Sequence, residues 1–180
     1  MTLHAPLFVA ALILGGGAAA IDGVAGRDDM TAVALAEAIV AGQMPRVFDL
    51  RSHAEFETFH IPSATRITIG DLMALDLPRS ASIVLYGDES ARVAQARAVL
   101  RFRGYRHVAS LRQGLYEWIA RVHEPALAVD ATPAERAEFD RLAALSRYFG
   151  GRPRLDVPRA ELHPSVETAL LVAAIRRRGC

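Results

Sequence analysis

Along the middle of the chain, short apolar runs are separated by segments in which apolar residues recur at the spacing of a helix. The run at 82–86 is almost wholly apolar, which is typical of a strand that is covered on both faces of a parallel sheet. Shorter runs at 46–50, 60–69 and 107–111 are also typical of strands, and the apolar residues between them follow a helical spacing. Strands and helices that alternate in this way predict an α/β domain with a central, mostly parallel sheet.

Residues that cap helices set the expected limits of the helical segments in this part of the chain. The predictions are a first helix from Asp28, Asp29 or Thr31 to Gly42, a turn with a capping box at Ser52 and Glu55, a short helix at 70–75, a helix from about Ala91 to Phe102 that ends at Gly104, and a helix at 114–122.

The pattern becomes helical after Glu124. A strong helix is predicted within 131–151, and a further helix is predicted within 163–180. The intervening segment, 152–159, is rich in proline and arginine and is predicted to be a loop. We therefore expect an α/β domain at 28–124 and a helical C-terminal extension at 125–180. The extension is expected to pack on the domain, because it is too small to be stable alone.

The first 24 residues have the features of an export segment. No charged side chain occurs before Asp22, the most apolar part is short, and Ala18 and Ala20 fit the A-x-A pattern of a cleavage site. A basic region is missing, and residues 3–21 are also long enough for an uncleaved membrane anchor. We expect a periplasmic or membrane-anchored protein, with a buried or disordered apolar tail as the alternative.

The composition excludes several kinds of partner and site. The chain has 21 basic and 20 acidic residues, so its charge does not favour nucleic acid as a partner. The single cysteine, Cys180, excludes an internal disulfide and a metal site made of several cysteines. The six histidines show no metal-binding spacing, and we expect neither a metal nor another cofactor.

Three segments in order resemble the rhodanese domain. They are VFDLRSHAEFETFHIPSA at 47–64, IVLYGDESAR at 83–92 and HVASLRQGLYEW at 107–118. The residues that match are Asp49, Arg51, Glu55, His60, Ile61, Pro62, Ala64, Gly114 and Trp118, whereas Ser63 and Gln113 stand in place of glycines. The resemblance spans 46 to about 122 and implies a three-layer rhodanese-like fold.

The resemblance also implies a reaction and its site. In active rhodaneses a cysteine in the loop after the central strand carries sulfur as a persulfide from a donor such as thiosulfate to an acceptor, and this requires a thiolate. The corresponding loop here is Gly87, Asp88, Glu89, Ser90, Ala91 and Arg92. Gly87 stands at the cysteine position, so a persulfide cannot form there. The family's sulfurtransferase reaction is not expected at this loop.

The charges of the loop admit two interpretations. Asp88 and Glu89 would disfavour a bound anion by ~1 kcal/mol each at a wet surface, with Arg92 as the offsetting charge. Alternatively, the side chains of Asp88, Glu89 and Ser90 serve only to cap the helix that follows. In both interpretations the loop is retained as architecture.

For several other polar residues the sequence allows both a structural and a functional role. Asp49 and Arg51 are expected to hold the backbone near the loop, and His60 to be a turn histidine or to contact the pocket rim. Four further arginines form either a solvated face or a docking surface for an acidic partner. They are Arg101, Arg103, Arg106 and Arg112.

Cys180 is the one thiol available for chemistry. It follows three arginines that favour its thiolate, so it could transfer sulfur if the tail folds toward the pocket. It could also link two chains through a disulfide, or have no special role. The leading hypothesis is a catalytically inactive rhodanese-like protein that binds an unknown protein partner or small ligand. The alternative is a sulfurtransferase or thiol-redox protein that uses Cys180.

Overall fold

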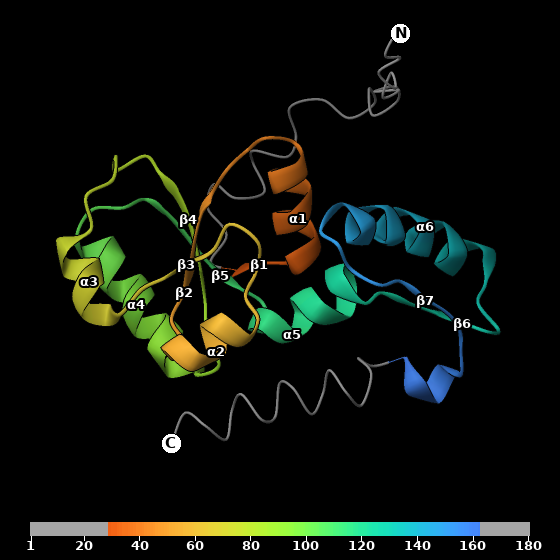
Figure 1. Ribbon diagram of the computed structural model, residues 1–180. Coiled ribbons are helices and arrows are strands. Elements are labelled where there is room, and N and C mark those ends of the chain that lie inside the picture. Colours follow the sequence, from red (N-terminus) through yellow and green to blue (C-terminus); the bar gives the residue numbers. More distant parts are fainter. Residues whose placement is uncertain (1–28, 163–180) are drawn as a thin grey trace, which may run out of the picture.

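The computed structural model describes residues 29–162 of the 180-residue chain (Figure 1). The export segment expected at 1–24, the helix expected within 163–180, and Cys180 lie outside the described residues.

A five-stranded parallel sheet forms the centre of the α/β domain. Its strands lie in the order β1 (Asp29–Met30), β5 (His107–Leu111), β4 (Ser82–Tyr86), β2 (Arg46–Asp49) and β3 (Thr65–Arg66). Every neighbouring pair is parallel, as the sequence predicted. Two details of the prediction were wrong. The strand predicted within 60–69 contains only two residues, and β1 was not foreseen.

Helices cover both faces of the sheet, which makes the domain three-layered (Figure 1). On one face lie α1 (Ala32–Val40), α5 (Gly114–Trp118) and the π-helical segment η1 (Ile119–His123). On the other face lie α3 (Ile69–Ala74) and α4 (Ser90–Phe102). Successive residues of β4 alternate between the two cores, because neighbouring side chains of a strand point to opposite faces.

Capping residues define the helix ends much as predicted. The hydroxyl of Thr31 accepts a hydrogen bond from the Ala34 N–H and begins α1, and Gly42 follows its end with a φ of 74°. The predicted capping box of Ser52 and Glu55 is present at the start of α2 (His53–Thr58).

The segment after the α/β domain is not purely helical within the described residues. It contains α6 (Pro133–Tyr148) and the short helix η2 (Arg159–Glu161), but also two parallel strands, β6 (Ala126–Ala128) and β7 (Arg154–Val157). The prediction of a loop at 152–159 was therefore wrong. In β7 only Val157 is buried, so its sequence has little of the alternation that marks a strand.

The extension packs firmly against the domain. Leu142 and Leu145 of α6 belong to the same core as α1 and α5. At the junction the carbonyl oxygen of His123 accepts hydrogen bonds from the Ser146 hydroxyl at 2.9 Å and the Arg152 N–H at 2.7 Å. A Cβ on Gly151 would collide with that carbonyl, so the chain passes where only glycine fits. This packing agrees with the prediction.

Candidate functional site

A pocket of about 600 Å³ lies at the carboxyl ends of β4 and β5, beside β1. Its walls come from the loop after β4, the first turns of α4 and the start of α5. In parallel α/β sheets, ligands bind at this edge. Its polar lining residues include Asp29, Arg51, Asp88, Arg97, Arg112 and Gln113.

Gly87 lines this pocket directly after the central strand. A Cβ built at Gly87 would lie 3.4 Å from the Cβ of Leu50 and 3.4 Å from Cγ2 of Val93, at the edge of ordinary van der Waals contact. Its φ is outside the left-handed region, so a larger residue is not strained by the backbone. The pocket therefore has room for a small side chain at residue 87.

Two residues that stand in place of family glycines have left-handed backbones. Ser63 has a φ of 70° and Gln113 a φ of 50°. Glycine adopts this conformation without cost, whereas other residues pay roughly 1–2 kcal/mol. The backbone thus keeps the shape that glycines favour at both places, which supports the alignment of the two flanking segments with the rhodanese domain.

The start of α5 approaches the loop closely. A Cβ built at Gly114 would lie 3.1 Å from the carbonyl oxygen of Gly87, and the φ of Gly114 is 54°. Both observations favour glycine at residue 114. The loop after β4 and the start of α5 thus form one packed unit around the pocket.

Glu89 does not cap α4 through its side chain, as the second interpretation expected of it. It is the N-cap residue, but its side chain makes no capping hydrogen bond. Its carboxylate instead pairs with Arg92 at 3.3 Å, and Ser90 already lies inside the helix. Arg92 also lies 3.5 Å from the Leu50 carbonyl oxygen and does not line the pocket.

Asp88 faces the start of α2. The pKa of Glu55 reflects this arrangement: burial would raise it, but hydrogen bonds from the Ser52 hydroxyl and N–H, an interaction with Asp88 and the charge of Arg51 hold it below its ordinary value. The Ser52 hydroxyl donates to a Glu55 carboxylate oxygen at 2.5 Å. An anionic carboxylate on Glu55 therefore stabilises the turn beside the pocket.

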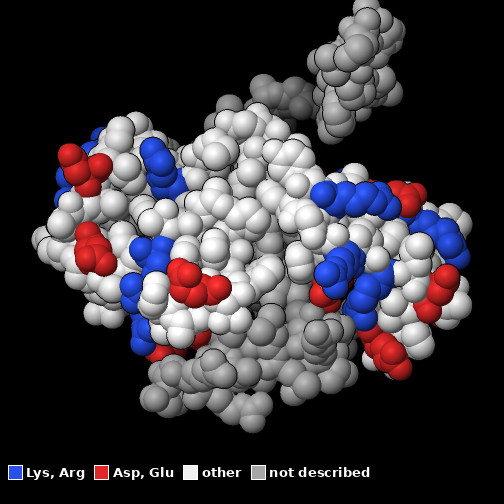
Figure 2. Space-filling model, viewed as in Figure 1, with Lys and Arg blue, Asp and Glu red and all other residues white. Residues whose placement is uncertain are grey.

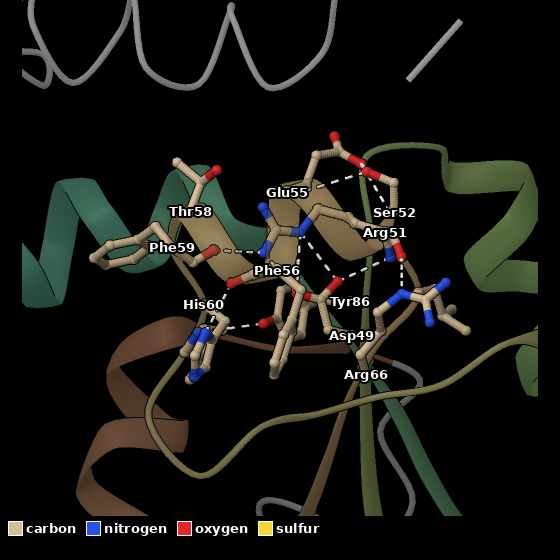
Figure 3. Close-up of polar contacts among 12 residues, drawn as sticks. Asp49, Arg51, Ser52, Glu55, Phe56, Thr58, Phe59, His60, Arg66 and Tyr86 are labelled. Carbon is tan, nitrogen blue, oxygen red and sulfur yellow. Dashed lines mark hydrogen bonds and ion pairs between the residues drawn. The ribbon is translucent and has the colours of Figure 1, made fainter. Parts of the chain in front are cut away.

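Asp49 and Arg51 form a fully buried ion pair behind the loop (Figure 3). Nη2 of Arg51 lies 2.5 Å from Oδ2 of Asp49, and the Arg51 backbone N–H donates to Oδ1 at 2.9 Å. Nη2 also donates to the Phe59 carbonyl at 2.8 Å. Burial alone would lower the pKa of Arg51, but the hydrogen bond and charge of Asp49 raise it above its usual value. The pair thus has the backbone-holding position that the sequence suggested.

Tyr86 completes this buried group and was missed by the sequence interpretation. Its hydroxyl accepts a hydrogen bond from the Ile61 N–H at 3.2 Å, and the Arg51 guanidinium lies 5.5 Å from its ring centroid (Figure 3). Burial and then the charge of Asp49 raise the pKa of Tyr86, so the phenol stays neutral. The available signal was a hydroxyl at the end of an otherwise apolar strand.

His60 is not among the residues that line the pocket, so the alternative of a rim contact does not apply. Its ring stacks on Phe56 with centroids 4.0 Å apart, and Nδ1 lies 2.9 Å from the Phe56 carbonyl oxygen (Figure 3). The side chain is exposed at the end of α2. It has the contacts of a turn histidine.

Two of the four further arginines, Arg103 and Arg112, lie in different places. Arg103 donates to the carbonyls of Leu72 and Leu75 at 2.6 and 2.8 Å, whereas Arg112 lines the pocket. On the face shown in Figure 2, basic and acidic side chains are interspersed. Arg103, held by carbonyls at the end of α3, and Arg112, in the pocket, therefore have separate surroundings.

Within residues 29–162 no group of three or more potential ligand side chains could hold a metal ion. None of the helices described there has the length and apolar character needed to cross a membrane.

Comparison with known proteins identifies the family. The sequence matches the family model of the rhodanese-like domain over residues 31–121. The protein therefore belongs to the rhodanese-like domain family. A search of curated proteins gave no match.

Solved structures similar to the chain include other rhodanese-like proteins. The rhodanese-like domain of the Alr3790 protein from Anabaena sp. is 28% identical, with 52% of this chain and 74% of that chain covered and a TM-score of 0.47. The human single-domain sulfurtransferase TSTD1 is 21% identical over 52% of this chain and 96% of that chain, also with a TM-score of 0.47. Saccharomyces cerevisiae RDL2, another single-domain sulfurtransferase, is 14% identical over 53% and 90%, with a TM-score of 0.46.

Proposed function

We propose that this protein is a rhodanese-like binding or regulatory module that does not transfer sulfur at the loop after β4. Persulfide chemistry at that loop requires a thiolate, and residue 87 is a glycine. The pocket then acts by binding a ligand or a partner segment rather than by forming a covalent intermediate.

The observation that carries the proposal is the position of Gly87. It lies in the wall of a formed pocket of about 600 Å³, directly after the central strand, with room for a Cβ. The neighbouring parts of the site are also formed, since Arg51, paired with Asp49, donates to the Phe59 carbonyl at the end of α2, and Gly114 approaches the carbonyl oxygen of Gly87 closely. On this proposal the loop differs from an active one in the glycine at residue 87 and in the charges of Asp88 and Glu89.

The pocket lining has charges of both signs. Asp29 and Asp88 contribute carboxylates, and Arg97 and Arg112 contribute guanidinium groups. Arg51 also lines the pocket, but its charge is offset by Asp49. A mixed lining of this kind is complementary to a ligand or peptide that carries groups of both charges.

Thiosulfate:cyanide sulfurtransferase activity tests the proposal. The full-length chain should form no thiocyanate above the buffer control, and Gly87→Cys should gain activity because the site accepts the new side chain. Cys180→Ala is the matched control, since it removes the one native thiol.

Two outcomes would contradict the proposal. Turnover by the wild type that is lost in Cys180→Ala would assign the chemistry to the C-terminal cysteine. Turnover that persists in Cys180→Ala would show a route that needs no thiol. An inactive wild type together with an active Gly87→Cys variant would support a loop that lacks only its nucleophile.

A further inference from the structure

Three arginines gather around the buried ring of Tyr105, at the amino ends of the central strands. The guanidinium carbons of Arg79 and Arg103 lie 4.5 and 5.8 Å from the centroid of that ring. The backbone N–H of Arg106 donates to the Arg79 carbonyl at 3.4 Å. Arg79 precedes β4 and Arg106 precedes β5, so this group lies at the opposite edge of the sheet from the pocket beside Gly87.

The charges of these three arginines are not offset by carboxylates. Among the described residues none of the three forms an ion pair, whereas Arg141 on α6 and Arg159 in η2 both pair with carboxylates. Nη1 of Arg103 donates instead to two backbone carbonyls, which fix the side chain but leave its positive charge. The surrounding segments 71–79 and 101–106 carry four arginines and two aspartates, so the net charge there is positive.

Two large apolar side chains are exposed close to Arg103. Phe102, the next residue along the chain and the last of α4, is 89% exposed. Met73 is 57% exposed and lies on α3 between Leu72 and Leu75, whose carbonyls bind Arg103. Figure 1 shows α3 and α4 together at the end of the molecule away from α6. We call this region the α3–α4 surface, and its members are Met73, Arg79, Phe102, Arg103 and Arg106.

We propose that the α3–α4 surface binds a membrane that contains anionic phospholipids, with Phe102 inserted among the headgroups and the three arginines on lipid phosphates. Protein surfaces that lie on membranes combine basic residues with phenylalanine, tryptophan or leucine. An anionic leaflet attracts basic residues close to it, and a guanidinium group can donate two hydrogen bonds to one phosphate. Insertion of Phe102 also removes a strongly exposed apolar side chain from water.

An acidic segment of another protein is the alternative partner for this surface. Peptides commonly dock in a groove or along a strand edge. The pocket beside Gly87 and a second cavity, between α5 and α6, include no residue of the α3–α4 surface. Side chains that project outward suit the broad face of a lipid bilayer, which needs no groove. The inference is independent of the proposed function, because it involves no residue of the loop after β4.

Quenching of tryptophan fluorescence by brominated lipid tests the inference in the full-length chain. Phe102→Trp places a reporter on the α3–α4 surface. Tyr148→Trp is the matched control, because Tyr148 is an exposed aromatic residue of α6. Trp118, the one native tryptophan, is buried and gives the same background in both variants. The vesicles are an equimolar mixture of phosphatidylglycerol and brominated phosphatidylcholine, with brominated phosphatidylcholine alone as the uncharged reference.

We expect the mixed vesicles to quench the Phe102→Trp variant at least ~2-fold more strongly than Tyr148→Trp, and the uncharged vesicles to quench both weakly. Adding Arg79→Gln and Arg106→Gln to Phe102→Trp should raise the lipid concentration for half-maximal quenching by about 5-fold for each arginine removed.

Three results would each overturn the inference. They are equal quenching of the two tryptophan variants, strong quenching of Phe102→Trp by the uncharged vesicles, and an unchanged half-maximal lipid concentration after the arginine substitutions. Absence of quenching at residue 102 would count as the first of these and would leave the acidic protein segment as the partner to test. Circular dichroism of each variant before lipid is added confirms that it is folded.

Discussion

The buried pair of Asp49 and Arg51 offers the sharpest test of what holds the pocket. The two side chains are 0% and 1% exposed, and Asp49 accepts hydrogen bonds from both the backbone and the side chain of Arg51. Asp49→Asn keeps the shape but removes the negative charge. The variant leaves the Arg51 guanidinium buried without a counter-charge, and breaking a buried pair in this way costs about 3–5 kcal/mol.

Urea unfolding followed by circular dichroism measures this cost as a change in the free energy of unfolding. Asp130→Asn is the control, because Asp130 pairs with Arg159 at 3.1 Å but is 61% exposed. Such a surface pair contributes at most about 1 kcal/mol. An Asp49→Asn cost as small as that of Asp130→Asn would refute the reasoning.

A double-mutant cycle separates the pair from its surroundings. Arg51→Met removes the cation and leaves a buried carboxylate, whereas the double variant removes both charges. We expect the double variant to be less destabilised than the sum of the single variants by about 1–3 kcal/mol. Additive costs would show that the two groups stabilise the fold independently.

Three further predictions concern particular positions. Glu135→Gln should flatten the fall in melting temperature between pH 4.5 and pH 2, because the hydrogen bond from its arginine partner lowers the pKa of Glu135 from 4.5 to about 2. The stabilisation by ionised Glu135 is present above pH 4.5 and is lost as the pH falls through the lowered pKa. Equal slopes of melting temperature against pH in the wild type and the variant would contradict this. Gly151→Ala should cost about 1–3 kcal/mol through collision with a backbone carbonyl, whereas Gly70→Ala in α3 should be neutral or stabilising; similar melting temperatures for both would contradict the collision. Ser63→Gly should stabilise the fold by up to ~1 kcal/mol by relieving its φ of 70°, and a clear loss of stability in urea unfolding would count against that account.

The sequence predicted the elements whose signal is local. The strand β4 has the predicted limits because four of its five residues are fully buried, so the strand stands out in the sequence as an almost continuous apolar run. The capping box at Ser52 was predictable because its two partners are three residues apart. The contact of Asp49 with Arg51 was predictable for the same reason, because the two residues are two positions apart.

Elements that depend on distant partners were missed. The two residues of β1 form a strand only because they pair with Ser110 and Leu111, far along the chain. The strand β7 depends in the same way on β6, since Val157 is its one buried residue. Such pairings leave no periodic pattern in a short segment.

The candidate site was predictable only in part. The resemblance pointed to Gly87 and the loop because the motif is contiguous in sequence. Asp29, Gln113 and Tyr116 line the same pocket from β1 and the start of α5, and only the folded arrangement brings them together. Of the two interpretations of His60, the structure has the turn histidine, whose ring stacks on Phe56.

Intact-protein mass spectrometry after incubation with thiosulfate tests most directly whether the loop transfers sulfur. A persulfide adds the mass of one sulfur atom, and excess cyanide removes it as thiocyanate. The account predicts no added sulfur on the wild-type chain and one cyanide-labile sulfur on residue 87 of the Gly87→Cys, Cys180→Ala variant. A cyanide-labile sulfur on the wild-type chain would contradict the central claim, and its loss in Cys180→Ala would make the C-terminal cysteine the sulfur carrier.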